Sequence, residues 1–155
     1  MKTLQIKTPT HCGAEIDFKE ILNKKNLILY FFPEIPFDNI SIVGQEAYLF
    51  KNYFVRLDLK QNEILGVTDD PRDLNKLFVQ RFAIPFHLVY DRDHQIAQQF
   101  DAVWNGKELQ RTLVCLQKGG TLKALYQGPA IEKKLKQMVQ MNLLPWYKKL
   151  FKKSF

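Results

Sequence analysis

The sequence predicts an α/β protein built on a central mixed sheet, and three observations support that fold class. A run of six apolar residues from Leu27 to Phe32, ended by Pro33, indicates a buried strand. Further apolar runs alternate with segments of helical periodicity, which is the pattern of a parallel sheet covered by helices. Near the end of the chain, two apolar runs flank Lys118–Gly120 and predict an antiparallel hairpin.

The strand over residues 26–32 is expected at the centre of the sheet. A continuous apolar run of this length is typical of a strand buried on both faces. Pro33 lacks an N–H group and cannot continue the ladder, so the chain must leave the sheet there. Because ligands usually bind beyond the carboxyl ends of such strands, residues 33–44 are the first candidate region for a site.

The flanking segments predict the neighbouring elements. Residues 2–12 are expected to form a small hairpin that turns at Thr8–Thr10, and residues 16–22 a short helix. Apolar residues recur at helical spacing from Ser41 to about Leu59, and residues 63–68 have the composition of a second buried strand.

The second half of the chain continues the alternation. Asp69–Asp70–Pro71 is typical of a helix start with an N-cap, and it precedes a helix over residues 72–82. Its apolar face is expected to hold Leu74, Leu77, Phe78 and Phe82. A strand over residues 85–90 follows, and then a short helix opened by Asp91, Asp93 and His94.

The hairpin over residues 111–126 and a helix over residues 131–139 complete the order. The predicted core consists of Leu27, Leu29, Phe31, Ile64, Val67, Leu88, Leu113 and Cys115.

Composition limits the class of protein. With 155 residues and 46% apolar residues, the chain can form one domain, which we place at residues 1–142. The N-terminal residues are too polar for a signal peptide, and two cysteines do not make a disulfide framework, so we expect a cytoplasmic protein. His11, His87 and His94 lie far apart in the sequence without paired cysteines, so neither a metal nor a cofactor is expected.

The positive charge is concentrated in one region. Residues 132–155 hold seven lysines against Glu132, a net +6 out of the formal +7 of the chain. The rest is nearly neutral, so a nucleic-acid-binding surface is not expected. Residues 143–155 form a basic aromatic tail that suits an anionic membrane or a protein partner, or packs back on the domain. Its expected contact residues are Trp146, Lys148, Lys149, Phe151, Lys152 and Lys153.

Five segments, in order, resemble the peroxiredoxins, above all the bacterioferritin-comigratory branch. They are Leu29–Pro33, Glu46–Ala47 with Phe50, Ile64–Asp69, Phe82–Phe86 with Tyr90–Asp91, and Arg111–Thr112 before the Lys-Gly-Gly turn. The resemblance covers roughly residues 27–138 and implies a thioredoxin-like fold of the peroxiredoxin type, an antioxidant oxidoreductase function and no cofactor. It also implies that Arg111 matches the arginine that stabilises the family's thiolate. A homodimer is among the expected assemblies.

At the positions that match the family's active site, this sequence departs from the family's pattern. The family places a threonine four residues and a cysteine seven residues after a proline. Counting from Pro33 gives Phe37 and Ile40, whereas counting from Pro36, the preferred register, gives Ile40 and Val43. The branch's second cysteine would fall at Tyr48. Neither aliphatic side chain offers a nucleophile, so Pro36, Ile40 and Val43 mark a degenerate active site.

Other residues are also candidates for a reactive role, and each has an ordinary structural role as the alternative interpretation. Cys115 lies in an apolar strand and is expected to be buried and inert. Cys12 is the alternative reactive thiol, although adjacent residues such as His11 point apart on a strand. Arg111 is expected either to bind an anion or to form a salt bridge with Glu34, Asp38 or Glu46, and His87 is interpreted as a half-buried strand residue.

Three functions remain open at this point. The first is a peroxiredoxin-like pseudoenzyme that has lost its peroxidatic cysteine and binds a partner or a small anion. The second is a thiol peroxidase or reductase that uses Cys12 at a rearranged site. The third is a peripheral membrane or scaffold protein that acts through residues 143–155. Peroxide consumption in Cys12 and Cys115 variants separates the first two.

Overall fold

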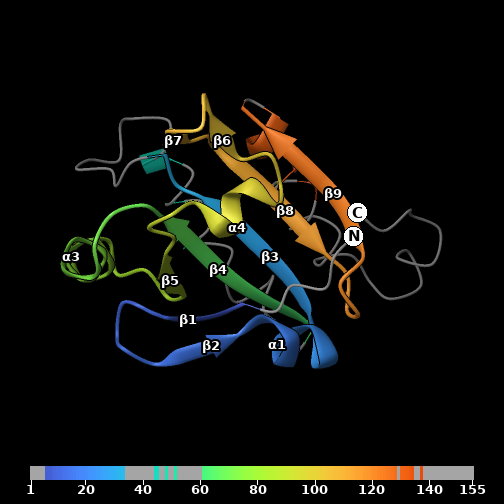
Figure 1. The fold of residues 1–155 in the computed structure, drawn as a ribbon, viewed down its shortest axis with the longest axis horizontal. Helices are drawn as coiled ribbons and strands as arrows, with labels where there is room; N and C mark the ends of the chain where they lie inside the picture. Colours follow the sequence, from blue (N-terminus) through green and yellow to red (C-terminus); the bar gives the residue numbers. More distant parts are fainter. Residues whose placement is uncertain are drawn as a thin grey trace.

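A computed structural model describes residues 6–33, 44–45, 48, 51, 61–128, 130–134 and 137. Its main element is a five-stranded sheet in the order β5-β4-β3-β8-β9 (Figure 1). The strands are β3 (Asn26–Phe31), β4 (Asn62–Thr68), β5 (His87–Tyr90), β8 (Thr112–Leu116) and β9 (Leu122–Gln127). Strands β3, β4 and β5 run parallel, whereas β8 pairs antiparallel with both β3 and β9. The mixed sheet and the central position of residues 26–31 are confirmed.

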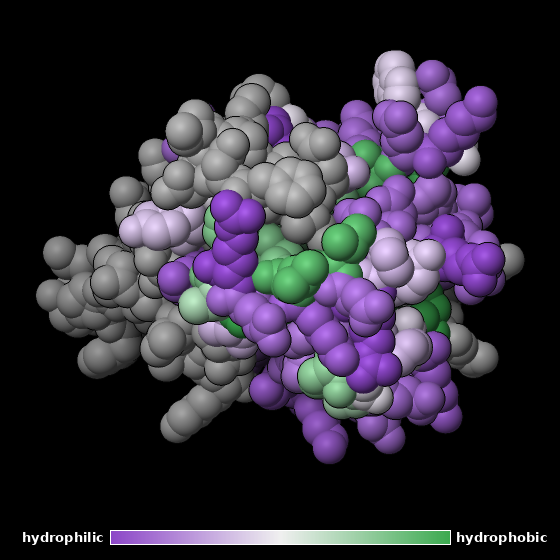
Figure 2. All heavy atoms as spheres, turned by 90° about the vertical axis from the view of Figure 1, so that its left-hand side faces the viewer, coloured by the Kyte–Doolittle hydropathy of each residue, from purple (hydrophilic) through white to green (hydrophobic). Residues whose placement is uncertain are grey.

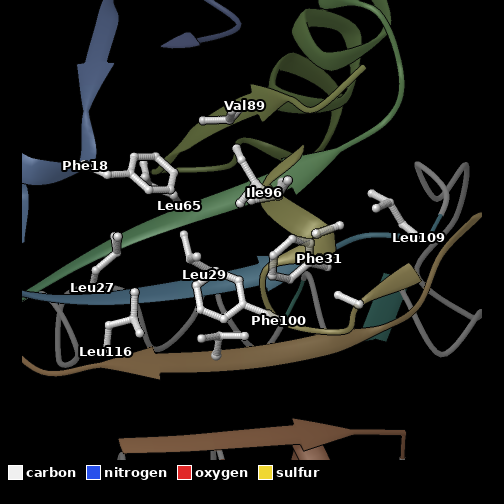
Figure 3. Packing of buried hydrophobic residues seen from close by; sticks show 14 of the residues in the cluster. Phe18, Leu27, Leu29, Phe31, Leu65, Val89, Ile96, Phe100, Leu109 and Leu116 are labelled. Atoms are coloured by element: carbon white, nitrogen blue, oxygen red, sulfur yellow. The ribbon is translucent and has the colours of Figure 1, made fainter. Parts of the chain in front are cut away.

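Strand β3 is buried on both faces, as its apolar run predicted. Alternate residues point to opposite sides: Ile28 and Tyr30 belong to one hydrophobic cluster, and Leu29 and Phe31 to the other. The second cluster, part of which Figure 3 shows, packs the sheet against the helices α1 (Phe18–Lys24) and α4 (Gln95–Gln98). All eight residues of the predicted core are buried.

Helix α3 (Arg72–Phe82) covers the other face, and its bounds agree with the prediction. Its predicted apolar face is wrong in part, because Leu74 and Leu77 are 42% and 61% exposed. Asn75 is buried instead, where it accepts a hydrogen bond from the Thr68 hydroxyl at 2.8 Å. Figure 2 shows the side of the molecule on which α3 lies, where the coloured residues are mostly hydrophilic and surround a hydrophobic patch near the centre.

The N-terminal hairpin differs from its prediction. Strands β1 (Lys7–Pro9) and β2 (Glu15–Asp17) pair antiparallel, so the turn lies at residues 10–14 rather than at Thr8–Thr10. Helix α1 begins two residues later than expected, because the Asp17 carboxylate accepts a hydrogen bond from the backbone N–H of Lys19 and caps it. A second hairpin, β6 (Val103–Trp104) with β7 (Glu108–Leu109), was not predicted.

Two predicted helices lie largely outside the described residues. Gly44, Gln45, Tyr48 and Lys51 are helical within the first, and residues 130–134 and 137 within the second. No helix in the described ranges is long and apolar enough to cross a membrane. The tail at residues 143–155 and the domain boundary at residue 142 fall outside those ranges and stay predictions.

Candidate thiol site

The site forms at the turn between β1 and β2, which depends on one glycine. The backbone N–H of Thr10 donates to the carbonyl of Ala14 at 2.8 Å, and that of Gly13 donates to the carbonyl of Thr10 at 3.0 Å. Gly13 has a φ of +86°, a left-handed conformation that glycine adopts without a steric penalty. A Cβ atom there would lie 2.6 Å from Nη2 of Arg72, so a side chain would also collide with that guanidinium.

The turn is held on the edge of the main sheet at β5. His11 donates its backbone N–H to the carbonyl of Leu88 at 2.9 Å, and Nδ1 of His11 accepts the N–H of Leu88 at 3.2 Å. Nε of Arg72, at the start of α3, donates to the carbonyl of His11 at 3.2 Å. Figure 1 shows this loop reaching toward β5 and α3. Two elements, β5 and α3, therefore fix the chain at His11, directly before Cys12.

Cys12 presents an exposed thiol with two polar neighbours. Its Sγ atom lies 3.1 Å from the hydroxyl oxygen of Thr10 and 3.7 Å from Nδ1 of His87. The His11 and His87 rings lie beside each other, with centroids 5.7 Å apart. One ligand atom from each of His11, Cys12 and His87 lies within 4.8 Å of the other two.

The surroundings favour the ionised thiol. The pKa of Cys12 is lowered, chiefly by the Thr10 hydroxyl, and further by backbone hydrogen bonding and the charge of Arg72. The pKa of His11 is lowered too, first by burial and then by the charges of His87, Lys76 and Arg72. Burial raises the pKa of Cys115 to about 12. The two cysteines are therefore opposites: Cys12 is accessible and its pKa is lowered, whereas Cys115 is buried and its pKa is raised.

The sequence did not predict this cluster. We expected His11 and Cys12 to point apart on a strand, which is wrong because residues 11–13 form a turn. The sequence distance between His11 and His87 argued against a shared site, but the docking of the turn on β5 brings them together. His87 is half-buried on its strand, as interpreted, yet it also contacts Cys12. A glycine directly after Cys12 was the available signal for a turn.

Arg111 lies in a different part of the molecule. It is half-buried and directly precedes β8, whose first residue pairs with Phe31 at the carboxyl end of β3. Cys12 docks on β5, and three inter-strand steps of about 4.8 Å separate β5 from β8. Strands β4 and β3 therefore lie between the strand on which Cys12 docks and the strand that Arg111 precedes.

Several predicted site residues lie outside the described ranges. They are the degenerate positions Pro36, Ile40 and Val43, the three carboxylates Glu34, Asp38 and Glu46 that were weighed as partners of Arg111, and the tail residues from Trp146 to Lys153. Their expected roles stay predictions.

The acidic residues near α3 and α4 have structural roles, but the predicted N-cap of α3 is wrong. Pro71, not Asp69 or Asp70, occupies the N-cap position of α3, and no side chain caps that helix. The Asp69 carboxylate instead pairs with Nε2 of His94 at 3.2 Å. The Asp91 carboxylate accepts the backbone N–H groups of Ile96 and Ala97 at 3.1 and 2.9 Å, which confirms its expected helix-start role.

Known proteins resemble the chain in sequence and in fold. The sequence profile of the AhpC/TSA family matches residues 2–125. A putative peroxiredoxin bcp of Coxiella burnetii is 24% identical over 138 residues, covering 84% of this chain and 89% of the relative. Peroxiredoxin Bcp of Bacillus subtilis is 31% identical over 109 residues, covering 63% and 65%.

Among solved structures, the bacterioferritin comigratory protein of Xanthomonas campestris matches with a TM-score of 0.75 and 19% identity. That match covers 90% of this chain and 91% of the other, and at this identity it shows the fold alone. It confirms the thioredoxin-like fold of the peroxiredoxin type that the resemblance implied. Because the family profile spans far more than half of the sequence, the protein belongs to the AhpC/TSA family, with relatives in its bacterioferritin-comigratory branch.

Proposed function

We propose that this protein is a thiol-dependent peroxidase of the AhpC/TSA family whose reacting group is Cys12. One observation carries the proposal: an exposed thiol lies within 3.1 Å of the Thr10 hydroxyl and 3.7 Å of the His87 imidazole, on a turn fixed by Arg72 and β5. A sulfur beside a hydroxyl and an imidazole is the arrangement of an activated nucleophile. The Xanthomonas campestris protein of like fold is described as having alkyl peroxide reduction activity, which supports the same reaction class.

The family's own catalytic position cannot supply the thiol. No cysteine occurs in the sequence between Pro33 and Glu46, and the two counted positions hold Ile40 and Val43. Cys115, the other cysteine, is 1% exposed in the middle of β8. We therefore assign the thiol chemistry of this chain to Cys12.

The proposed step is a two-electron exchange between sulfur and peroxide. The Cys12 thiolate attacks one oxygen of a hydroperoxide, the S–O bond forms, and the O–O bond breaks. The departing oxygen takes up a proton and leaves as an alcohol or as water. Thr10 donates a hydrogen bond to the thiolate, and His87 is placed to carry the proton.

A second thiol must then reduce the sulfenic acid. Cys115 is buried within the sheet and cannot reach Cys12, so the reductant is an external thiol. One external thiol condenses with the sulfenic acid, which releases water and forms a mixed disulfide. A second external thiol displaces Cys12 and leaves as the external disulfide.

The direct test follows the consumption of hydrogen peroxide and of an alkyl hydroperoxide with dithiothreitol as reductant. We expect turnover by the wild type and by Cys115→Ala, and its loss in Cys12→Ser. A sulfenic acid on Cys12, trapped with a dione and located by mass spectrometry, is the expected intermediate. Equal consumption by the wild type and Cys12→Ser overturns the proposal.

A second candidate is the pseudoenzyme that binds a partner or a small anion. It is favoured by the absence of a thiol at both counted catalytic positions while Arg111 keeps the family's place before β8. It predicts that the wild type and the Cys12→Ser, Cys115→Ser double variant consume peroxide equally. In that case, anion binding followed by calorimetry in the wild type and Arg111→Gln becomes the informative experiment.

A further inference from the structure

Cys12 belongs to a cluster of three groups that are metal ligands by their chemistry. Two imidazoles and one thiol converge at the protein surface, each offering one ligand atom within 4.8 Å of the others. Thiolate sulfur and imidazole nitrogen are the protein ligands that zinc and monovalent copper prefer. The proposed peroxide reduction involves Cys12, Thr10 and His87, and it gives His11 no role.

We propose that His11, Cys12 and His87 bind a thiophilic metal ion, Zn²⁺ or Cu⁺. Three protein ligands leave one coordination position of a tetrahedral ion open to solvent, because Cys12 is exposed and both histidines are only half-buried.

The distance between the two best placed ligands fits an ion. Zn–S and Zn–N bonds of about 2.3 and 2.1 Å at a tetrahedral angle place the sulfur about 3.6 Å from the nitrogen. The Sγ atom of Cys12 lies 3.7 Å from Nδ1 of His87. These two side chains therefore need almost no movement to share a metal.

His11 requires a local adjustment. Its Nδ1 atom accepts the backbone N–H of Leu88 at 3.2 Å, so coordination through this nitrogen replaces that hydrogen bond. The full set spans at most 4.8 Å, so a shift of about 1 Å brings the third ligand to tetrahedral spacing.

The surrounding residues hold the ligands from outside the metal. The Thr10 hydroxyl lies 3.1 Å from Sγ and donates to a bound thiolate. Arg72 anchors the carbonyl of His11, and the left-handed Gly13 closes the turn. His11 and Cys12 thus lie on a turn held by hydrogen bonds, and His87 lies on β5. The backbone of all three ligands is therefore already positioned before an ion binds.

The metal proposal does not depend on the peroxidase proposal, although both use the sulfur of Cys12. A bound ion occupies the electron pair of the thiolate, so metal and peroxide compete for Cys12. The placement of the three ligand atoms supports metal binding even if Cys12 reduces no peroxide. Turnover measured on chelator-treated protein therefore tests the peroxidase alone, and metal binding measured without peroxide tests the site alone.

The test is a titration of the reduced, metal-free full chain with Co²⁺, followed by competition with Zn²⁺. We expect one equivalent to give a sulfur-to-cobalt charge-transfer band with tetrahedral d–d bands, and Zn²⁺ to displace it. Cys12→Ser should abolish the charge-transfer band, and His87→Ala and His11→Ala should each weaken binding at least about tenfold. His94→Ala, a histidine paired with Asp69 outside the cluster, is the matched control and should bind normally.

A parallel arm measures Cu⁺ against a colorimetric chelator with the same variants. Binding of Cu⁺ but not Zn²⁺, with the same dependence on His11, Cys12 and His87, supports the site and assigns it to copper. Circular dichroism of each variant shows that it is folded. The proposal is overturned if neither ion binds, or if binding is unaffected by both histidine substitutions, since the thiol alone then accounts for it.

Discussion

At the scale of single residues, the two cysteines differ through their surroundings. Cys12 lies on an exposed turn beside Thr10, His87 and Arg72, and Cys115 lies inside β8 between two sheet neighbours. The pKa of the first is lowered by hydrogen bonds, and the pKa of the second is raised to about 12 by burial. The same side chain is therefore an exposed thiol with a lowered pKa in one place and part of the core packing in the other.

The raised pKa of Cys115 predicts a pH-dependent stability. The thiol of the unfolded chain, with the ordinary cysteine pKa of 9.0, releases its proton in a pH range where the folded thiol keeps it. The unfolded state then binds fewer protons, so the free energy of unfolding falls as pH rises from about 9, by up to about 1.4 kcal/mol per pH unit. Urea melts between pH 8 and 10.5 measure this slope. Cys115→Ala should be less stable overall, yet its unfolding free energy should fall less steeply with pH. Equal slopes in the two proteins would contradict a raised pKa of Cys115 in the folded state.

Gly13 offers a second prediction at this scale. Gly13→Ala should cost about 1–2 kcal/mol for its left-handed backbone and should also displace Arg72, so the turn around Cys12 changes. We expect a lower unfolding free energy and an altered rate of Cys12 labelling with a disulfide reagent. Gly106→Ala is the control, because Gly106 also has a positive φ but no atom lies within 4 Å of its Cβ position. It should lose stability and keep the labelling rate.

At the scale of elements, helix α3 shows how tertiary contacts choose a buried face. The apolar pattern favoured Leu74 and Leu77, but the helix turns Asn75 and Phe78 inward. Asn75 is accommodated because its amide nitrogen donates to the carbonyl of Asp70 at 3.2 Å and its oxygen accepts from Thr68. A buried amide with its partners satisfied is tolerated, so apolarity alone did not determine the orientation.

Two neighbouring residues on α3 should therefore respond differently to truncation. Phe78 is 2% exposed and contacts the Phe32 and Phe82 rings, so Phe78→Ala should cost about 3–5 kcal/mol. Leu77 is 61% exposed, and Leu77→Ala should change stability by less than about 0.5 kcal/mol. Chemical denaturation of both variants measures the difference. A comparable loss in the two variants would show that the helix is rotated relative to this structure.

At the scale of the whole molecule, the sheet divides the protein into two hydrophobic layers, and β3 contributes to both. Its neighbours are β4 on one side and β8 on the other, so residues from both halves of the chain meet on this strand. The Cys12 cluster lies at the β5 side of this sheet, and Arg111 precedes β8 on the other side of β3. The fold thus separates Arg111 from the accessible thiol of Cys12.

The central strand predicts a large effect of a single truncation. Leu29 is fully buried between β4 and β8, so Leu29→Ala should cost about 2–5 kcal/mol and lower the melting temperature by on the order of 10 °C. Differential scanning calorimetry measures the shift, with Leu74→Ala as an exposed leucine for comparison. If both variants melt at the same temperature, β3 does not have the central position described above.

The amino-acid sequence by itself determined the α/β class, the central strand, the closing hairpin and the eight core residues. These features follow from local patterns: an apolar run stopped by Pro33, alternating periodicities, and a glycine turn between two strands. The same pattern of segments led to the family. That Ile40 or Val43 occupies the family's catalytic position stays a prediction from residue spacing.

Only the tertiary structure decided the candidate site. His11 and Cys12 are separated from His87 by about half of the chain, and no local pattern encodes their meeting. They meet because Gly13 makes a turn where a strand was expected, and because backbone hydrogen bonds dock that turn on β5. Long-range docking of this kind depends on the complementarity of two surfaces. Periodicity and residue spacing are local patterns, so they do not predict such complementarity.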